Sequence, residues 1–189
     1  MSLQAIFAIR RNGSFIKYHS MKLKLALSAF LFVLTIHAIG QQNHNWDSWA
    51  WLMGEWKGEG GGQPGQGNGA FSFTTDLDQK VLIRKAHSEY PATESKPKVV
   101  HDDLMVIYAD TGSKPTKAIY FDNEGHTINY DISYTEKTIV LISAKLPGVP
   151  VFRLTYTLLE KESVGIKFEM SMDGEKFMTY VEGKSVRVK

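Results

Sequence analysis

Residues 46–62 read Trp46-Asp-Ser-Trp-Ala-Trp-Leu-Met-Gly-Glu-Trp-Lys-Gly-Glu-Gly-Gly-Gly62 and hold all four tryptophans of the 189-residue chain. Trp46, Trp49 and Met53 follow one another at i, i+3 and i+7, a spacing that predicts one or two helical turns with a single buried face. Gly54 ends this helix. Charged and aromatic side chains then alternate, which predicts a first β-strand. We therefore expect a short helix that caps one end of a β-structure.

The four tryptophans are expected mainly to pack in a hydrophobic core. Each indole can bury on the order of 200 Å² of surface, and its N–H usually finds a hydrogen-bond acceptor. A tryptophan that stacks against a ligand is the alternative role.

Nine further extended segments follow, separated by short polar or glycine-containing turns. The clearest alternation runs from His126 to Tyr134, where apolar and polar residues take turns along the whole segment. These expected strands are residues 70–75, 80–90, 104–108, 117–121, 126–134, 137–144, 151–159, 163–171 and 176–186.

Ten sequential strands joined mostly by hairpins predict an antiparallel meander. An open sheet of this kind would expose two edges that can pair with other chains. Closure into an up-and-down barrel removes both edges. The predicted fold is therefore all-β: a single antiparallel up-and-down β-barrel of about ten strands with a short N-terminal helix capping one end. A two-sheet sandwich is the alternative.

Five residues near the start of this region, Leu52, Gly54, Trp56, Gly58 and Gly60, resemble the opening of the nitrobindin-like and lipocalin-like (calycin) β-barrels. The resemblance is closest to exported bacterial members of that group, whose function is unknown. It implies that residues 41–189 form a calycin-like barrel domain. It also implies that the interior binds a small, largely apolar molecule reversibly.

Residues 21–40 have the three parts of a signal peptide. Met21-Lys-Leu-Lys is the charged start, Leu25–Ile39 is apolar, and small residues lead to Gly40. We expect cleavage after Gly40 and export to the periplasm or the extracellular medium. The apolar part is short for a membrane span, so stable membrane insertion after cleavage is not expected. An uncleaved amphipathic anchor is the alternative.

Residues 1–20 precede a signal peptide that is already complete. Either they extend its charged region, or the natural start of the protein is Met21. We favour the second interpretation, because export requires nothing in this segment.

The charge of the chain depends on its N-terminal segment. The full sequence has 22 basic and 20 acidic side chains, but residues 1–40 hold five of the basic groups and none of the acidic ones. The remaining residues carry a formal net charge of −3, which gives nucleic-acid binding no electrostatic support. The absence of cysteine excludes disulfides, thiolate chemistry and a lipidated cysteine. Stability must therefore come from the core, for which about 149 residues suffice.

Alternation also indicates which side chains could line the barrel interior. Arg84 shares its face with Leu82 and Ala86, so it could point inward and hold a carboxylate through a bidentate pair. A solvated or surface-paired arginine is the alternative, and Arg153 is expected to face outward. The interior candidates are Trp56, Phe73, Arg84, His126, Tyr130, Tyr156, Phe168 and Tyr180.

No catalytic motif is present, so we assign no catalytic residue and leave enzymatic activity open. If residues 80–90 and 101–108 pair, His87 and Glu89 could approach His101 and Asp103, a combination that suits a divalent metal. Solvated polar residues at strand ends are the alternative, and no metal site is predicted.

The nitrobindin resemblance further implies a haem-binding histidine in the last strand, but the matching run is Tyr180-Val-Glu-Gly183. Tyrosinate can ligate ferric iron, yet a phenol must first lose a proton with a pKa near 10. No cofactor is therefore predicted. A haem-dependent or metal-assisted enzyme and a packed barrel with a structural role stay as alternatives. The sequence indicates neither the ligand nor the oligomeric state.

Overall fold

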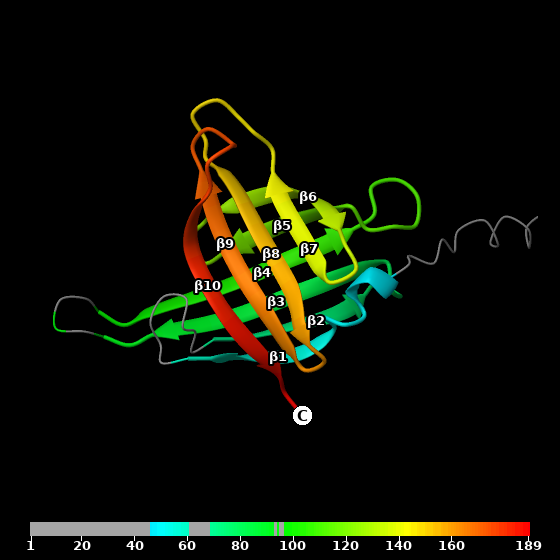
Figure 1. The fold of residues 1–189 in the computed structure, drawn as a ribbon, viewed down its shortest axis with the longest axis horizontal. Coiled ribbons are helices and arrows are strands. Elements are labelled where there is room, and N and C mark those ends of the chain that lie inside the picture. Colours follow the sequence, from blue (N-terminus) through cyan, green and yellow to red (C-terminus); the bar gives the residue numbers. More distant parts are fainter. Residues whose placement is uncertain (1–45, 61–68, 93, 95–96) are drawn as a thin grey trace, which may run out of the picture. The chain divides into compact units, whose positions relative to one another are not determined.

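The computed structural model describes residues 46–60, 69–92, 94 and 97–189. Within these ranges the chain forms one 3-10 turn, η1 (Asp47–Trp49), and ten strands (Figure 1). The strands are β1 (Gly54–Glu59), β2 (Gly69–Asp76), β3 (Val81–Tyr90), β4 (Val99–Tyr108), β5 (Lys117–Asp122), β6 (Thr127–Tyr134), β7 (Thr138–Ser143), β8 (Val151–Glu160), β9 (Ser163–Ser171) and β10 (Met178–Arg187). The segments 1–20 and 21–40, with the predicted signal peptide, lie outside the described residues.

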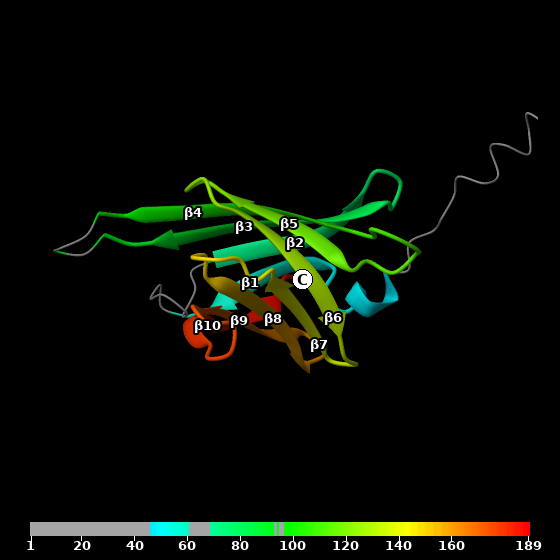
Figure 2. The same ribbon diagram turned by 90° about the horizontal axis from the view of Figure 1, so that it is seen from above.

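The strands form a closed antiparallel barrel in which each strand pairs with its neighbours in the sequence (Figures 1 and 2). β1 and β10 close the ring, with Trp56 opposite Arg187. The predicted up-and-down barrel is thus confirmed. Closure pairs the first strand with the last, so neither of these two strands is left as a sheet edge within the described residues.

The predicted N-terminal helix is only the 3-10 turn η1. The turn ends at Trp49, and Gly54, the first residue of β1, has a φ of 104°, a backbone conformation that favours glycine. A Cβ at this position would also lie 2.9 Å from Nη1 of Arg187. In the described part of the chain, no helix is long and apolar enough to cross a membrane.

One end of the barrel, the closed end, is packed with aromatic side chains. Trp49 is fully buried and lies against Phe73 and Tyr134, with ring centroids 5.6 and 6.1 Å apart. Its indole Nε1 donates to the Tyr134 hydroxyl over 2.8 Å. Trp46 donates from Nε1 to the backbone oxygen of Gln79 in the β2–β3 turn. The indole N–H groups thus have acceptors while the rings exclude water from this end.

Burial of the inward-facing side chains falls toward the opposite end of the barrel, here named the open end. On β3, Leu82 and Arg84 are buried but Ala86 is half-buried. The strand register places His101 of β4 beyond Ala86 on the same face, and it is half-buried too. At this end the half-buried apolar residues that pack against the core are Ala86, Tyr120, Ile128, Phe152 and Phe168. Side chains therefore fill the closed end more completely than the open end.

The β3–β4 hairpin is longer than its neighbours and extends past them at the open end (Figures 1 and 2). β3 and β4 pair as far as Tyr90 and Val99, whereas β5 pairs with β4 only from Asp103 onward. Asn123 in the β5–β6 turn continues the ladder by donating from its backbone N to the oxygen of Asp102 over 3.0 Å. Its side-chain amide donates to the oxygen of Val100. The turn therefore covers the β4 edge that β5 leaves unpaired.

Candidate functional site

Arg84 lies on the inner face of β3, halfway along the barrel, and is only 8% exposed. Its guanidinium carbon is 5.5 Å from the centroid of the Phe71 ring on β2. Burial by itself would lower the pKa of Arg84, but the nearby Tyr156 and Asp103 raise it. The guanidinium therefore keeps its charge inside the barrel.

Asp103 on β4 is the counter-ion of Arg84. Its carboxylate accepts a hydrogen bond from Nη1 of Arg84, and the two side chains are 7% and 10% exposed. The register pairs Asp103 with Ala86, so the ion pair runs diagonally between the two strands. Burial raises the pKa of Asp103, and the charge of Arg84 counters that rise only in part. The interior thus holds one ion pair in a largely apolar setting.

Two buried polar atoms beside this pair have no hydrogen-bond partner within the described ranges: Nε of Arg84 and the hydroxyl of Tyr156. Tyr156 comes from β8 and is fully buried. Burial raises its pKa to about 12, so the phenol is neutral at physiological pH. Leaving a buried polar group unpaired costs about 1–3 kcal/mol. These two donors thus lie buried without an acceptor in hydrogen-bond geometry, although Arg84 is close enough to Tyr156 to lower the pKa of its phenol in part.

Tyr130 and Tyr120 add two more phenols near Arg84. Burial is the main cause that raises the pKa of each, so both hydroxyls are neutral. Tyr130 is 3% exposed, whereas Tyr120 is half-buried toward the open end. The interior can therefore donate and accept hydrogen bonds without carrying a further charge.

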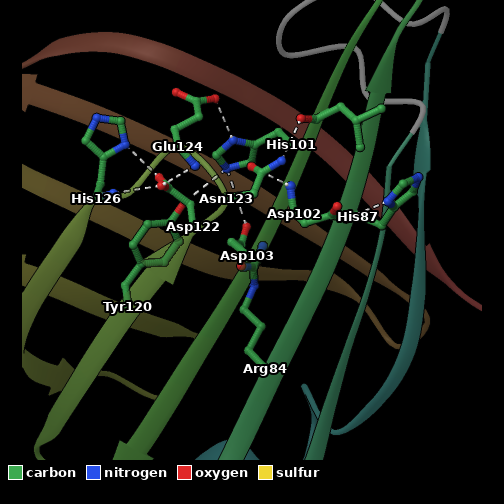
Figure 3. A network of polar contacts seen from close by, with 11 residues as sticks. Arg84, His87, His101, Asp102, Asp103, Tyr120, Asp122, Asn123, Glu124 and His126 are labelled. Carbon is green, nitrogen blue, oxygen red and sulfur yellow. Dashed lines mark hydrogen bonds and ion pairs between the residues drawn. The ribbon is translucent and has the colours of Figure 1, made fainter.

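A chain of polar contacts links this pair to the rim of the open end (Figure 3). His101 Nε2 lies 3.8 Å from Oδ2 of Asp103 and 3.0 Å from the hydroxyl of Tyr120. The Tyr120 hydroxyl in turn donates to Oδ2 of Asp122 over 3.3 Å. On its other side, His101 Nδ1 lies 3.1 Å from Oε1 of Glu124. The β5–β6 turn is thereby tied to the inner face of β4.

Asp122 organises that turn. Its Oδ1 accepts from the backbone N of Glu124 and of His126, and its Oδ2 lies 2.8 Å from Nδ1 of His126. Burial would raise the pKa of Asp122, but the His126 and Glu124 contacts lower it. The carboxylate raises the pKa of His126 in return. The His126 side chain lies at the surface and is 62% exposed, whereas the Asp122 side chain is only 4% exposed.

The predicted pairing of the third and fourth strands is present, but it does not bring the suggested metal ligands together. His87 lies opposite Asp102, and His101 lies opposite Ser88. Because side chains alternate between the two faces of a strand, His87 and His101 lie on opposite sides of the sheet. His87 contacts Asp102 (Figure 3), and its Nε2 lies 3.4 Å from Oε1 of Glu89 on the same outer face. Within the described residues, no group of three or more acidic or histidine side chains could hold a metal ion.

The remaining interior candidates fall into two sets. Trp56 and Phe73 are almost fully buried, and Trp56 donates from Nε1 to the oxygen of Leu52 over 2.7 Å. Phe168 is half-buried and stacks on Phe152 at the open end. Tyr180, however, is 71% exposed at a register shift in β10 and meets Phe168 edge-on. Tyr180 and His126 therefore lie on the rim, apart from the buried set.

Sequence reasoning did not assign Asp103 to Arg84, and it missed Tyr120 altogether. The period of two would have placed Asp103 on the same face as Met105 and Ile107, which is the available signal. Pairing it with Arg84 requires the register between the two strands, which the sequence does not state. Arg153 does lie outside, where its Nε contacts Oε2 of Glu169 over 2.7 Å.

The fold and these residues define the class: a closed ten-stranded antiparallel barrel, counted over the described residues, that is compatible with a calycin-like fold. Neither a known protein family nor a curated protein sequence matches the chain significantly.

Proposed function

We propose that this protein binds a small, largely apolar molecule reversibly inside the barrel, with entry at the open end. The observation that carries the proposal is the pair of buried, inward-facing donors, Arg84 Nε and the Tyr156 hydroxyl, without partners among the described residues. An acceptor on a ligand would recover hydrogen bonds that the protein leaves unmade. Known ligand sites have this composition: apolar walls with a few convergent polar groups.

The half-buried side chains at the open end support the same proposal. Phe152 and Phe168 stack with ring centroids 5.8 Å apart on the inner face of β8 and β9. Covering such rings with an apolar molecule removes more of their surface from water and contributes about 25 cal/mol per Å². The apolar part of the ligand would thus contact these rings while its polar atom meets Arg84 and Tyr156.

The resemblance at residues 52–60 is in keeping with a nitrobindin-like or lipocalin-like carrier of the exported bacterial type. As part of the proposal, residues 21–40 direct export and are removed, so the binding protein works in the periplasm or outside the cell. Intact mass of protein from the native host tests this part. A mature N-terminus at Gln41 supports export with cleavage, and a mass that retains Leu25–Ile39 contradicts it.

The binding test uses N-phenyl-1-naphthylamine, a neutral apolar probe whose fluorescence rises when it leaves water. Ala86 faces inward at the open end and lies opposite Phe71 of β2. Ala70 of β2 faces outward and lies opposite Lys57 of β1. We expect the wild type to bind the probe, Ala86→Trp to abolish binding by filling the interior, and the control Ala70→Trp to leave it unchanged. Equal binding by both variants would place the probe outside the barrel and contradict the proposal.

A further inference from the structure

The charge of Arg84 is already cancelled before any ligand arrives. Asp103 accepts from Nη1 of Arg84, and both side chains are at least 90% buried. A buried carboxylate in direct contact with a guanidinium neutralises it at a range where water screens little. The interior polar site as a whole, with the phenols of Tyr156 and Tyr130, is therefore close to neutral.

A ligand carboxylate at this site would lie close to the carboxylate of Asp103, which carries the same charge. A free arginine can bind a carboxylate through two parallel hydrogen bonds. Here Asp103 takes up one part of that fork, so a second carboxylate would lie near a like charge in a medium of low dielectric. It would also lose its own hydration, which is costly for an ion without a full counter-charge. The ion pair thus opposes ligands of negative charge.

The groups next to the pair do not reverse this balance. His101 lies 3.8 Å from Asp103, on the opposite side of that carboxylate from Arg84 (Figure 3). Asp122, which accepts from Tyr120, adds negative charge to the same region. Glu124 adds another beyond His101. Because Asp122 also contacts His126 and Glu124 contacts His101, each imidazole at the rim has a carboxylate beside it, and the rim adds no excess of positive charge in front of Arg84.

The donors that remain suit an uncharged acceptor. Arg84 Nε and the Tyr156 hydroxyl offer one hydrogen each, and one carbonyl oxygen has two lone pairs. We infer that the barrel selects neutral apolar molecules with a hydrogen-bond acceptor, such as an ester, ketone or amide, and that Asp103 is the residue that excludes free carboxylic acids. This inference rests on the proposed function and specifies its ligand class.

The test compares two fluorescent ligands with the same hydrocarbon chain, cis-parinaric acid and its methyl ester, at neutral pH. The wild type is expected to bind the ester at least about tenfold more tightly than the ionised acid, and tenfold corresponds to about 1.4 kcal/mol. Asp103→Asn frees the charge of Arg84. The acid should then bind at least about tenfold more tightly than to the wild type, with the ester changed less than about threefold.

The neighbouring residue provides a matched control. Asp102→Asn removes the same charge one position away, on the outer face, where the side chain is 54% exposed. Its preference for the ester should equal that of the wild type. A wild type that binds the acid as tightly as the ester, or an unchanged preference in Asp103→Asn, would overturn the inference.

A second variant covers the case in which Asp103→Asn does not fold because Arg84 is left unpaired. Arg84→Gln with Asp103→Asn replaces both charges by neutral groups of similar size. If the charge of Asp103 cancels that of Arg84, the ratio of the ester affinity to the acid affinity in this double variant stays within about threefold of the wild-type ratio. A selective loss of acid binding would show instead that Arg84 was free to hold a carboxylate, and would overturn the inference.

These results also separate the inference from the proposal beneath it. Binding of N-phenyl-1-naphthylamine together with a preference for the acid would overturn the ligand class and leave the binding function standing. Failure of the wild type to bind the probe, the acid and the ester would overturn both.

Discussion

The closed end and the open end of the barrel use the same inward-facing strand positions but fill them with different side chains. At the closed end, Trp49 and Trp56 are fully buried and their indole N–H groups have acceptors. Halfway along the barrel, the interior holds the Arg84–Asp103 pair and buried donors without partners in the described residues. Stability is therefore expected to depend on apolar packing at the closed end and on charge pairing at Arg84, and ligand recognition on the region around Arg84. The predictions below test that division.

The largest effect is expected at Trp56, which stacks on Phe71 and lies under the guanidinium of Arg187. Trp56→Ala should lower the free energy of unfolding by about 3–5 kcal/mol, because it leaves a cavity in a fully packed region. Urea titration measures the change. The control Tyr180→Ala removes an exposed aromatic from the rim and should cost less than about 0.5 kcal/mol. Similar losses in both variants would contradict the division.

The ion pair halfway along the barrel should give a loss of similar size, but one that a second substitution reverses. Arg84→Met leaves Asp103 buried without a counter-ion, which should cost about 3–5 kcal/mol at neutral pH. Replacing both residues, Arg84→Met with Asp103→Leu, should restore most of the lost stability because apolar residues of similar volume avoid the desolvation penalty. A double-mutant cycle in urea measures this recovery. A double variant as unstable as Arg84→Met would mean that the pair itself is needed for folding.

A smaller effect is expected where Tyr134 joins η1 to the rest of the barrel. Its hydroxyl accepts from Trp49 Nε1 and donates to the oxygen of Pro115. Tyr134→Phe leaves Nε1 of Trp49 and the oxygen of Pro115 without this hydrogen-bond partner. The substitution should lower the free energy of unfolding by about 1–3 kcal/mol. Tyr180→Phe, which removes an exposed hydroxyl, is the control and should be neutral. Equal stability of the two variants would show that the indole contact contributes nothing.

The smallest effect concerns pH at the rim. The raised pKa of His126 means that its contact with Asp122 contributes fully below the unperturbed pKa near 6.5. The contribution is lost as the pH rises through the folded-state pKa. It also disappears in acid, as the pH falls through the lowered pKa of Asp122. His126→Gln should remove this pH-dependent part of the stability, whereas His87→Gln removes a separate part due to Asp102.

Proton NMR of the imidazole measures the same effect directly. The pKa of His126 should lie above 6.5 in the wild type and move down toward 6.5 in Asp122→Asn. Asp102→Asn, which changes the partner of His87, should leave His126 where it was. An unshifted His126 in the wild type would mean that the contact is absent in solution.

The alternation of side chains, read from the sequence, was enough to predict much of the barrel and part of its interior. A strand of period two that buries one face must send its apolar set inward. For that reason Tyr130, Tyr156 and Phe73, predicted for the interior, lie buried on the inner face. Closure followed as well, because ten hairpin-linked strands avoid exposed edges only by forming a ring. The N-terminal element was expected as a helix, but residues 47–49 form only a 3-10 turn.

The sequence by itself therefore determined which face of its strand each residue lies on and which turns join the strands. It also determined that Arg84 shares a face with apolar residues. Only the tertiary structure decided which of those residues meet. Placing Asp103 beside Arg84, separating His87 from His101 and leaving Tyr180 exposed at a register shift all depend on strand register. Alternation is a local property, because the face on which a side chain lies is opposite to that of the residue before it in the same strand. Register is set by packing and hydrogen bonding across the whole barrel, which the order of residues in one strand does not specify.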